Sequence, residues 1–212
     1  MLCADKSAWL ITNHAPNRIL SSYTGIDGDI IAVDGGLQTV FEQKLSPKII
    51  VGDLDSLNPA LFNEYPDTPL LRHESRKNAT DTELALDWCV TQGYTRIIIC
   101  NDMQGRFDHC LAIVQNLLDL HRQGIMAFIE SDSQRIFFIR ESLTLKGKKG
   151  DLLSLVAYSP CVCFIASEGL EYPLKGLRIH QHQSRGISNV FDREEISLKV
   201  AEGEVLAIYT PL

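Results

Sequence analysis

Short apolar runs alternate with amphipathic segments through the first 130 residues of the chain. Apolar runs without polar alternation predict strands that are buried on both faces. These runs lie at 8–12, 30–34, 49–51, 97–100 and 126–130. Segments with helical spacing of apolar residues separate several of them. This order predicts an α/β fold with a mostly parallel, Rossmann-like sheet, right-handed connections and helices on both faces.

Two helices in this half have clear sequence signals. Thr80 and Glu83 match a capping box, so a helix is predicted to begin here and to run to Gly93. Another helix is predicted after the loop 101–109, with apolar residues at helical spacing up to Gly124.

The pattern changes near residue 132. Strand-like runs separated by glycine-containing turns follow, with no helical period between them. They lie at 136–140, 152–158, 161–165, 196–200 and 205–209. Such spacing predicts an all-β antiparallel sandwich or barrel. We therefore expect two domains, 1–131 and 132–212.

Acidic residues follow two of the predicted strands. Asp34 precedes Gly35 and Gly36, a turn that allows close approach of a ligand to the backbone. Asp53 and Asp55 follow the run 49–51, and ligands of parallel sheets bind beyond such strand ends. In an extended Asp-x-Asp segment both carboxylates leave the same face, and their mutual repulsion favours binding of a cation. Carboxylate oxygens are hard ligands that suit Mg²⁺, an ion that proteins usually share with substrate phosphates. A solvated turn that caps a helix is the alternative.

Other charged residues are expected near the same edge of the sheet. Asp81 falls in the first turn of a predicted helix, where it could also simply complement the helix dipole. Arg106, Asp108 and His109 lie within four residues, after the strand 97–100. A solvated loop is the alternative interpretation of this segment.

Composition limits the possible partners. The chain has 27 acidic and 20 basic residues, a net charge of -7, so an anionic substrate needs local cations or metal, and nucleic acid is not an expected partner. The six cysteines form no Cys-x-x-Cys, which fits a reducing, cytoplasmic setting. No signal peptide is expected, and no apolar run approaches the roughly 20 residues of a membrane span. His180 and His182 are separated by one residue, a spacing that can place two histidines on one metal ion. Two histidines on a solvent-facing strand or loop have the same spacing without binding metal.

Several of these segments occur in the same order as in the thiamine pyrophosphokinase family, which the chain resembles from residue 34 to 189. They are Asp34-Gly35-Gly36, Gly52-Asp53-Leu54-Asp55-Ser56, Thr80-Asp81 and Gly105-Arg106-Phe107-Asp108-His109. Residues 169–174 and 184–189 resemble the thiamine-binding region of that family.

The resemblance implies an ATP–Mg²⁺ domain at 1–131 and a thiamine-binding β-sandwich at 132–212. It implies a homodimer with each site shared between two subunits, and transfer of a diphosphate from ATP to thiamine with release of AMP. Asn78 stands where the family often has aspartate, and Gln104 where bacterial members often have glycine. The first departure leaves the number of metal ligands open.

Roles follow for individual residues. Asp53, Asp55 and Asp81 are expected to bind Mg²⁺ and, with Arg106, to act in catalysis. The expected nucleotide contacts are Asp34, Gly35, Gly36, Lys77, Thr80, Asp108 and His109. The expected thiamine contacts are Tyr172, which resembles a stacking aromatic, and Ser188 and Asn189, which resemble hydrogen-bond partners. The thiamine hydroxyl is expected to attack the β-phosphorus directly and in line.

Two other functions are compatible with parts of the pattern. An apolar strand followed by Asp-x-Asp also opens haloacid-dehalogenase-type phosphatases, although here Gly52 separates strand and acid and no late Asp-Asp pair follows an apolar run. A non-catalytic module that binds thiamine or nucleotide is the other alternative.

Overall fold

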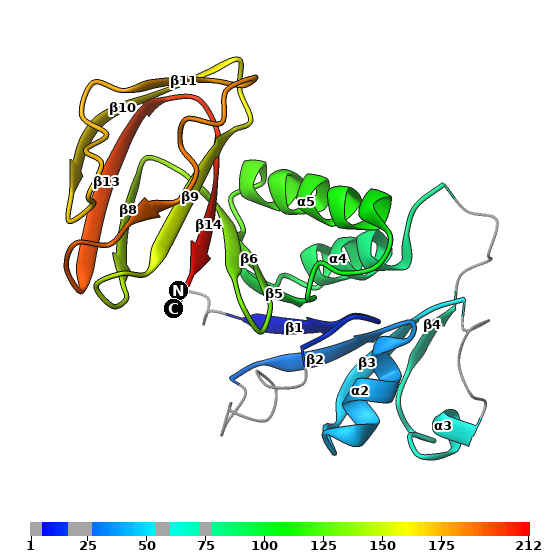
Figure 1. The fold of residues 1–212 in the computed structure, drawn as a ribbon. Helices are drawn as coiled ribbons and strands as arrows, with labels where there is room; N and C mark the ends of the chain where they lie inside the picture. The colour runs from blue at the N-terminus through cyan, green and yellow to red at the C-terminus, as the bar shows by residue number, and fades with distance from the viewer. Residues whose placement is uncertain (1–5, 17–26, 54–59, 73–77) are drawn as a thin grey trace, which may run out of the picture. The chain divides into compact units, whose positions relative to one another are not determined.

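The structure, a computed structural model, describes residues 6–16, 27–53, 60–72 and 78–212. The chain divides into two compact units, Met1–Asp132 and Ser133–Leu212 (Figure 1). Each unit has its own hydrophobic core.

The first unit is built on a parallel sheet with the strand order β6-β5-β1-β2-β3-β4. Every adjacent pair in this series is parallel. The strands are β1 (Ser7–Ile11), β2 (Asp29–Val33), β3 (Pro47–Gly52), β4 (Leu70–Arg72), β5 (Arg96–Cys100) and β6 (Met126–Glu130). The parallel sheet confirms the mostly parallel α/β class predicted for this half. The short β4 was not predicted, because its partly exposed residues form no buried apolar run.

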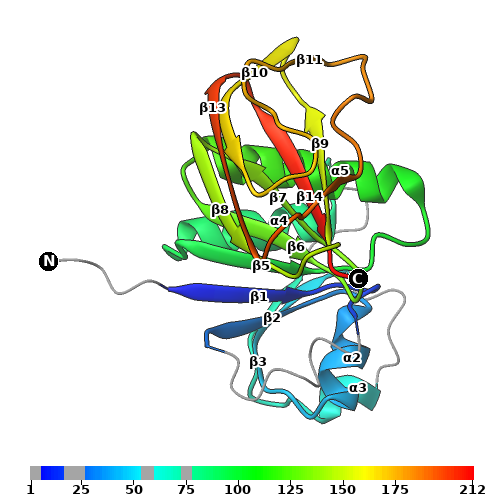
Figure 2. The ribbon, with the colours of Figure 1, turned by 60° about the vertical axis from the view of Figure 1, so that its left-hand side comes forward.

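Four described helices accompany these strands: α2 (Gly36–Glu42), α3 (Ala60–Asn63), α4 (Asp81–Thr91) and α5 (Phe107–Arg122). Figures 1 and 2 show α2 and α3 on one side of the sheet and α4 and α5 on the other. One core cluster joins alternate strand residues such as Trp9, Ile11 and Ile98 to Leu37 of α2 and Leu61 of α3. Since successive side chains of a strand point to opposite faces, coverage of both faces explains the unbroken apolar runs.

The predicted boundary of α4 is confirmed at its start. The Thr80 hydroxyl oxygen accepts a hydrogen bond of 3.2 Å from the Glu83 backbone N–H. The helix ends at Thr91, two residues before the predicted Gly93, which has φ +76°. Helix ends are commonly uncertain by that much in sequence-based prediction.

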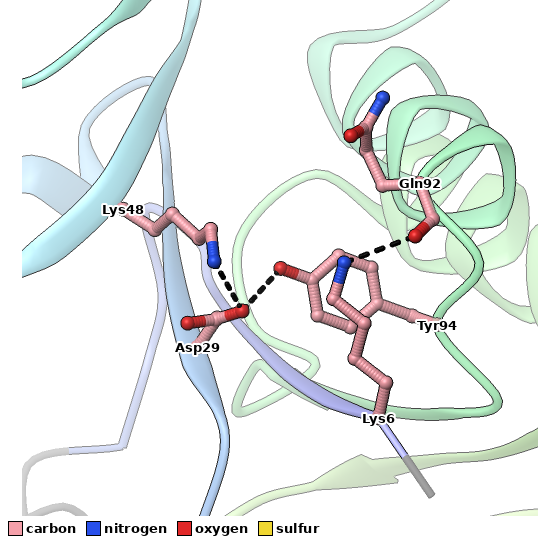
Figure 3. Close-up of polar contacts among 5 residues, drawn as sticks. All are labelled: Lys6, Asp29, Lys48, Gln92 and Tyr94. Atoms are coloured by element: carbon pink, nitrogen blue, oxygen red, sulfur yellow. Dashed lines mark hydrogen bonds and ion pairs between the residues drawn. The ribbon is translucent and has the colours of Figure 1, made fainter. Parts of the chain in front are cut away.

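A polar cluster ties the amino ends of β1, β2 and β3 to the end of α4 (Figure 3). Asp29 Oδ2 accepts hydrogen bonds from Lys48 Nζ at 2.8 Å and from the Tyr94 hydroxyl at 2.6 Å. Lys6 Nζ donates to the Gln92 carbonyl oxygen at 2.9 Å and lies 3.9 Å from the centroid of the Tyr94 ring. Burial raises the pKa of Asp29, but the hydrogen bonds from Lys48 and Tyr94 outweigh burial and hold that pKa below its ordinary value.

The second unit is all β. Its strands pair in two series, β12-β9-β14-β7 and β11-β10-β13-β8, and every pair within them is antiparallel. The strands are β7 (Arg135–Ile139), β8 (Ser142–Lys146), β9 (Leu152–Ala157), β10 (Cys161–Glu168), β11 (Arg178–His180), β12 (Asn189–Val190), β13 (Glu195–Glu202) and β14 (Val205–Thr210). The antiparallel β domain is confirmed. The sequence did not predict β8, β11 or β12, which are half-exposed or only two or three residues long.

One carboxylate is buried in this unit. Asp151 is 1% exposed and accepts hydrogen bonds from the Tyr209 hydroxyl at 2.5 Å, the Lys148 N–H at 2.7 Å and the Leu212 N–H at 3.0 Å. Burial raises the pKa of Asp151, yet these donors outweigh burial and the pKa is lowered. The carboxylate therefore joins the end of the chain to the turn before β9.

Among the helices of the described residues, none combines the length and the apolar character that crossing a membrane requires.

Candidate functional site

The strand order creates a crevice between β1 and β5. From β1 the chain adds β2, β3 and β4 on one side, and it then returns to place β5 on the other side of β1. In open parallel sheets, ligands bind beyond the carboxyl ends of the strands at such a reversal. Several of the polar residues predicted to form the site lie at this edge of the sheet.

A cavity of about 280 Å³ lies at this crevice. Residues 12–14 after β1, Asp34 after β2 and Asn101 after β5 line it. Its other walls are the start of α4 at 80–82 and residues of the α5 turn, including Arg106 and His109. The structure therefore brings together five predicted site residues: Asp34, Thr80, Asp81, Arg106 and His109.

The turn after β2 packs its backbone tightly against the end of β1. A Cβ on Gly36 would lie 1.9 Å from the Ile11 carbonyl oxygen, and a Cβ on Gly35 would lie 2.2 Å from Asn13 Oδ1. No larger residue fits either position without displacing these atoms. The glycines thus have a packing role, and their contact with nucleotide stays a prediction.

Buried polar contacts fix the two strand ends that border the crevice. The Thr12 hydroxyl donates to the Cys100 carbonyl oxygen at 2.8 Å and accepts a hydrogen bond of 2.8 Å from Asn101 Nδ2. The His14 carbonyl oxygen accepts from the Asp102 N–H at 2.7 Å. Sequence reasoning did not assign site roles to Thr12, Asn13, His14 or Asn101. Their position directly after two apolar strands was the available signal.

The loop before α5 holds a forked ion pair. Arg106 Nε and Nη2 lie 3.1 and 2.6 Å from the two carboxylate oxygens of Asp108. The side chains are 73% and 64% exposed, so water screens the pair and it adds little to folding stability. The hydrogen bond from Arg106 lowers the pKa of Asp108, and the same bond raises the pKa of Arg106. Arg106 lines the cavity, and the donor edge formed by its Nε and Nη2 is occupied by Asp108.

Asp53 is half-buried directly after Gly52, and a Cβ on Gly52 would lie 3.3 Å from the Asp34 Cα. The end of β3 therefore lies against Asp34, and Asp53 is the next residue along the chain. Asp55 and Lys77 lie outside the described residues. Within 6–16, 27–53, 60–72 and 78–212, no group of three or more His, Cys, Asp or Glu side chains could hold a metal ion. The predicted ligand set of Asp53, Asp55 and Asp81 stays a prediction.

The predicted acceptor residues lie in the second unit. Tyr172 and Asn189 line a pocket of about 380 Å³ together with Pro173, Leu174 and Ile187. Tyr172 is 60% exposed, so its ring is available to a flat ligand.

Asn189 is buried and already bonded. Its Oδ1 accepts from the Tyr172 N–H at 3.0 Å and the Val190 N–H at 2.9 Å, and its Nδ2 donates to the Tyr172 carbonyl oxygen at 2.8 Å. Asn189 thus holds the backbone that carries Tyr172. Ser188 is exposed with φ +57°, and its N–H donates to Ser154 Oγ at 3.0 Å.

The histidine pair of β11 and the following turn shows no metal geometry. The rings of His180 and His182 stack with their centroids 5.9 Å apart, and both residues are exposed.

Models of known protein families match both units of this chain. The thiamin pyrophosphokinase catalytic domain matches residues 27–129, and the thiamin pyrophosphokinase vitamin B1 binding domain matches residues 140–205. The chain belongs to the thiamine pyrophosphokinase family. Membership identifies it as an enzyme of this family and disfavours both the phosphatase and the non-catalytic binding module.

Individual members of the thiamine pyrophosphokinase family resemble the chain along nearly all of its length. The thiamine pyrophosphokinase of Bacillus subtilis (strain 168) is 25% identical over 200 residues, which cover 91% of this chain and 94% of that protein. A Bacillus subtilis thiamine pyrophosphokinase crystal structure has a TM-score of 0.87 at 22% identity, covering 97% of this chain and 99% of its own. A Geobacillus thermodenitrificans thiamin pyrophosphokinase structure has a TM-score of 0.84 at 25% identity, covering 97% and 98%.

Proposed function

We propose that this chain transfers a diphosphate group from ATP to the hydroxyl of thiamine and releases AMP. The observation that carries the proposal is the cavity at the β1–β5 crevice, where two carboxylates, Asp34 and Asp81, share one site with Arg106 and His109. A triphosphate with its metal needs both kinds of group, cations for phosphate oxygens and acids for the metal. Family membership supports thiamine as the acceptor.

Each charged group of the site has a proposed role toward the nucleotide. Arg106 binds phosphate oxygens with its planar fork, and its ion pair with Asp108 breaks when it does so. Lys77 interacts with the phosphates as a point charge. The remaining nucleotide contacts are Asp34, Gly35, Gly36, Thr80, Asp108 and His109.

Of the three carboxylates proposed to hold Mg²⁺, Asp81 lines the cavity, Asp53 follows β3, and Asp55 lies outside the described residues. Carboxylates are hard oxygen ligands, and Mg²⁺ in proteins commonly takes one or two of them, keeps several waters and shares substrate phosphates. The proposed ligands are Asp53, Asp55 and Asp81, and the neutral Asn78 adds no charge to them. When bound, the ion neutralises charge on the phosphate oxygens.

The transfer is proposed to be direct, with the thiamine hydroxyl attacking the β-phosphorus in line with the departing AMP. Two cavity side chains that could serve as nucleophiles are already bonded. The Thr12 hydroxyl donates its proton to the Cys100 carbonyl oxygen, and the Cys110 thiol lies 3.7 Å from the Gln104 carbonyl oxygen. We propose that the site acts by positioning and charge neutralisation, without a covalent phosphoenzyme.

Thiamine is proposed to stack on Tyr172 in the pocket of the second unit, near Ser188 and Asn189. We also propose a homodimer in which the phosphate site of one subunit and the thiamine pocket of the other form each active site, in a cytoplasmic setting. A two-fold dimer supplies both components twice through one interface.

Incubation with ATP, Mg²⁺ and thiamine, followed by chromatography of the nucleotides and of thiamine compounds, tests the reaction. The proposal requires AMP and thiamine diphosphate in equal amounts. ADP or free phosphate would indicate other phosphoryl chemistry such as that of a phosphatase. Unreacted bound ligands would indicate a binding module.

The shared site is tested by co-expression of Asp55→Asn and Tyr172→Ala chains that carry different tags. Each variant alone is expected to be nearly inactive. A mixed dimer has one site with both lesions and one with neither, so about half of the wild-type activity per mixed dimer should return. If tandem purification isolates the mixed dimer and it remains inactive, each site belongs to a single subunit.

A further inference from the structure

The loop between β5 and α5 passes through two left-handed backbone conformations before it reaches Arg106. Met103 has φ +54° and Gly105 has φ +83°. Glycine adopts this region freely, but a residue with a Cβ is disfavoured there. Asparagine and aspartate tolerate it because their short polar side chains bond to the nearby backbone, and methionine has no comparable group. The conformation of Met103 therefore has to be held by its neighbours.

Asn101 holds Met103 through its side chain. Asn101 Oδ1 accepts a hydrogen bond of 2.7 Å from the Met103 N–H, the contact of an Asx turn. The Asn101 N–H donates to the Glu130 carbonyl oxygen at 3.1 Å, and Asn101 Nδ2 donates to the Thr12 hydroxyl at 2.8 Å. Asn101 and Thr12 are buried, so water does not readily compete for these bonds. Asn101 is thus anchored to β6 and to the end of β1 while it fixes the backbone of Met103.

The path of the chain from Met103 to Arg106 depends on this turn, because Met103 lies only three positions before Arg106. Between them, Gly105 packs against His14, where a Cβ would lie 2.8 Å from His14 Nε2. Arg106 is the N-cap residue of α5, and its carbonyl oxygen accepts a hydrogen bond of 3.2 Å from the Cys110 N–H. The direction of the backbone at Met103 therefore bears on how the loop meets α5 and where Arg106 enters the cavity wall.

We propose that Asn101 is a positioning residue of the phosphate site, which holds Met103 in its left-handed conformation and thereby places Arg106 for the phosphates of ATP. This inference rests on the proposed function of Arg106. Asn101 also lines the cavity, so a direct contact with the nucleotide is the competing explanation. The two differ in one respect. An effect through the backbone of Met103 can be relieved by a change at Met103, whereas a lost contact with the nucleotide cannot.

Rescue by glycine separates the two explanations. Asn101→Ala removes the acceptor for the Met103 N–H and should weaken binding of α,β-methylene-ATP with Mg²⁺ at least about fivefold in calorimetric titration of the full chain. This analogue cannot release AMP, so binding is measured without turnover. Glycine adopts φ +54° without help, so adding Met103→Gly to Asn101→Ala should restore the affinity to within about twofold of the wild type. Met103 is not among the described residues that line the cavity, and its replacement removes no cavity wall.

Turnover assays give a second readout that general destabilisation does not reproduce. Asn101→Ala should raise KM for ATP and leave KM for thiamine unchanged, and Met103→Gly should reverse the change in KM for ATP. Lys44→Gly is the matched control, because Lys44 has φ +55° at an exposed position after α2 and is not among the described residues that line the cavity. Added to Asn101→Ala, it relieves the same kind of backbone strain elsewhere and should restore nothing.

Met103→Val tests the same hold without a change at Asn101, so it applies even if Asn101→Ala fails to fold. A β-branched residue resists φ +54° more strongly than methionine does. The affinity for α,β-methylene-ATP should therefore fall at least about threefold in Met103→Val.

Three results would overturn the inference: wild-type affinity for the analogue in Asn101→Ala or in Met103→Val, no recovery when Met103→Gly is added to Asn101→Ala, or equal recovery when Lys44→Gly is added. Failure of the proposed function has a different signature, because the wild-type chain would then form no thiamine diphosphate from ATP and thiamine. Formation of the product without this pattern of loss and recovery removes the inference alone.

Discussion

Substitution of Asn189 can distinguish a residue that holds the predicted thiamine pocket in shape from one that contacts the ligand. The Asn189 side chain makes three hydrogen bonds, at 2.8, 2.9 and 3.0 Å, and two of them hold the N–H and the carbonyl group of Tyr172. Asn189→Ala removes all three, and the residue is only 4% exposed, so water does not readily replace them at the Asn189 end.

The expected loss follows from these bonds. A neutral hydrogen bond contributes about 0.5–1.5 kcal/mol net, and Tyr172 at the surface regains part of its bonding from water. We therefore expect Asn189→Ala to lower the free energy of unfolding by about 2–3 kcal/mol in urea titration. The affinity for thiamine should fall as well, because the backbone below the Tyr172 ring is no longer held.

Two variants give the comparison its controls. Asn189→Asp keeps the acceptor for the two N–H groups but places an anionic oxygen against the Tyr172 carbonyl oxygen at a buried position, so it should be destabilised more at pH 7 than at a pH low enough to protonate the new carboxyl group. Ser188→Ala removes a hydroxyl from an exposed position and should change stability by less than about 0.5 kcal/mol. If Asn189→Ala unfolds like the wild type and yet binds thiamine poorly, Asn189 acts on the ligand and the positioning argument is wrong.

Three further changes test other parts of the molecule. Arg106→Lys should lower kcat/KM for ATP at least about tenfold, because an ammonium cannot make the forked contact that Arg106 now makes to Asp108; an unchanged ATP dependence would remove Arg106 from the phosphate site. Tyr94→Phe should lower the free energy of unfolding by about 1 kcal/mol through loss of the bond to Asp29, with AMP formation unaltered, and an unaltered urea midpoint would contradict this. The lowered pKa of Asp151 means that its carboxylate stabilises the fold above the unfolded value of about 4 and that this contribution is lost as pH falls through the folded pKa. Asp151→Asn should therefore be less stable at pH 7 and lose less on acidification below pH 4, and parallel pH profiles of the two proteins would refute the assignment.

The sequence by itself determined the elements with strong local signals. Unbroken runs such as 97–100 identify strands covered on both faces, and the capping box at Thr80 marks the start of α4. The alternation of strands and helices, followed by a helix-free half, was enough for the mixed fold class. The family was identified from short segments that occur in the same order along the chain as in its members. Some of these segments, such as Gly35-Gly36, contain glycines at positions where a Cβ would not fit.

Weak local signals left the short edge elements unpredicted. β4, β11 and β12 are only two or three residues long, and they exist because a neighbouring strand offers its free backbone groups. Nothing in their own composition distinguishes them from loops.

Tertiary structure alone decided which residues meet. The pairing of β1 with β5 joins residues about 90 positions apart, so Thr12 and His14 become walls of the same cavity as Arg106. The buried side chain of Asn189 is hydrogen-bonded to the backbone of Tyr172. Lys175, Arg178 and Arg185 line one groove around β11. The local pattern shows which face of an element is apolar, but which elements become neighbours depends on packing between distant segments. That packing brings the charged and polar residues of this site together.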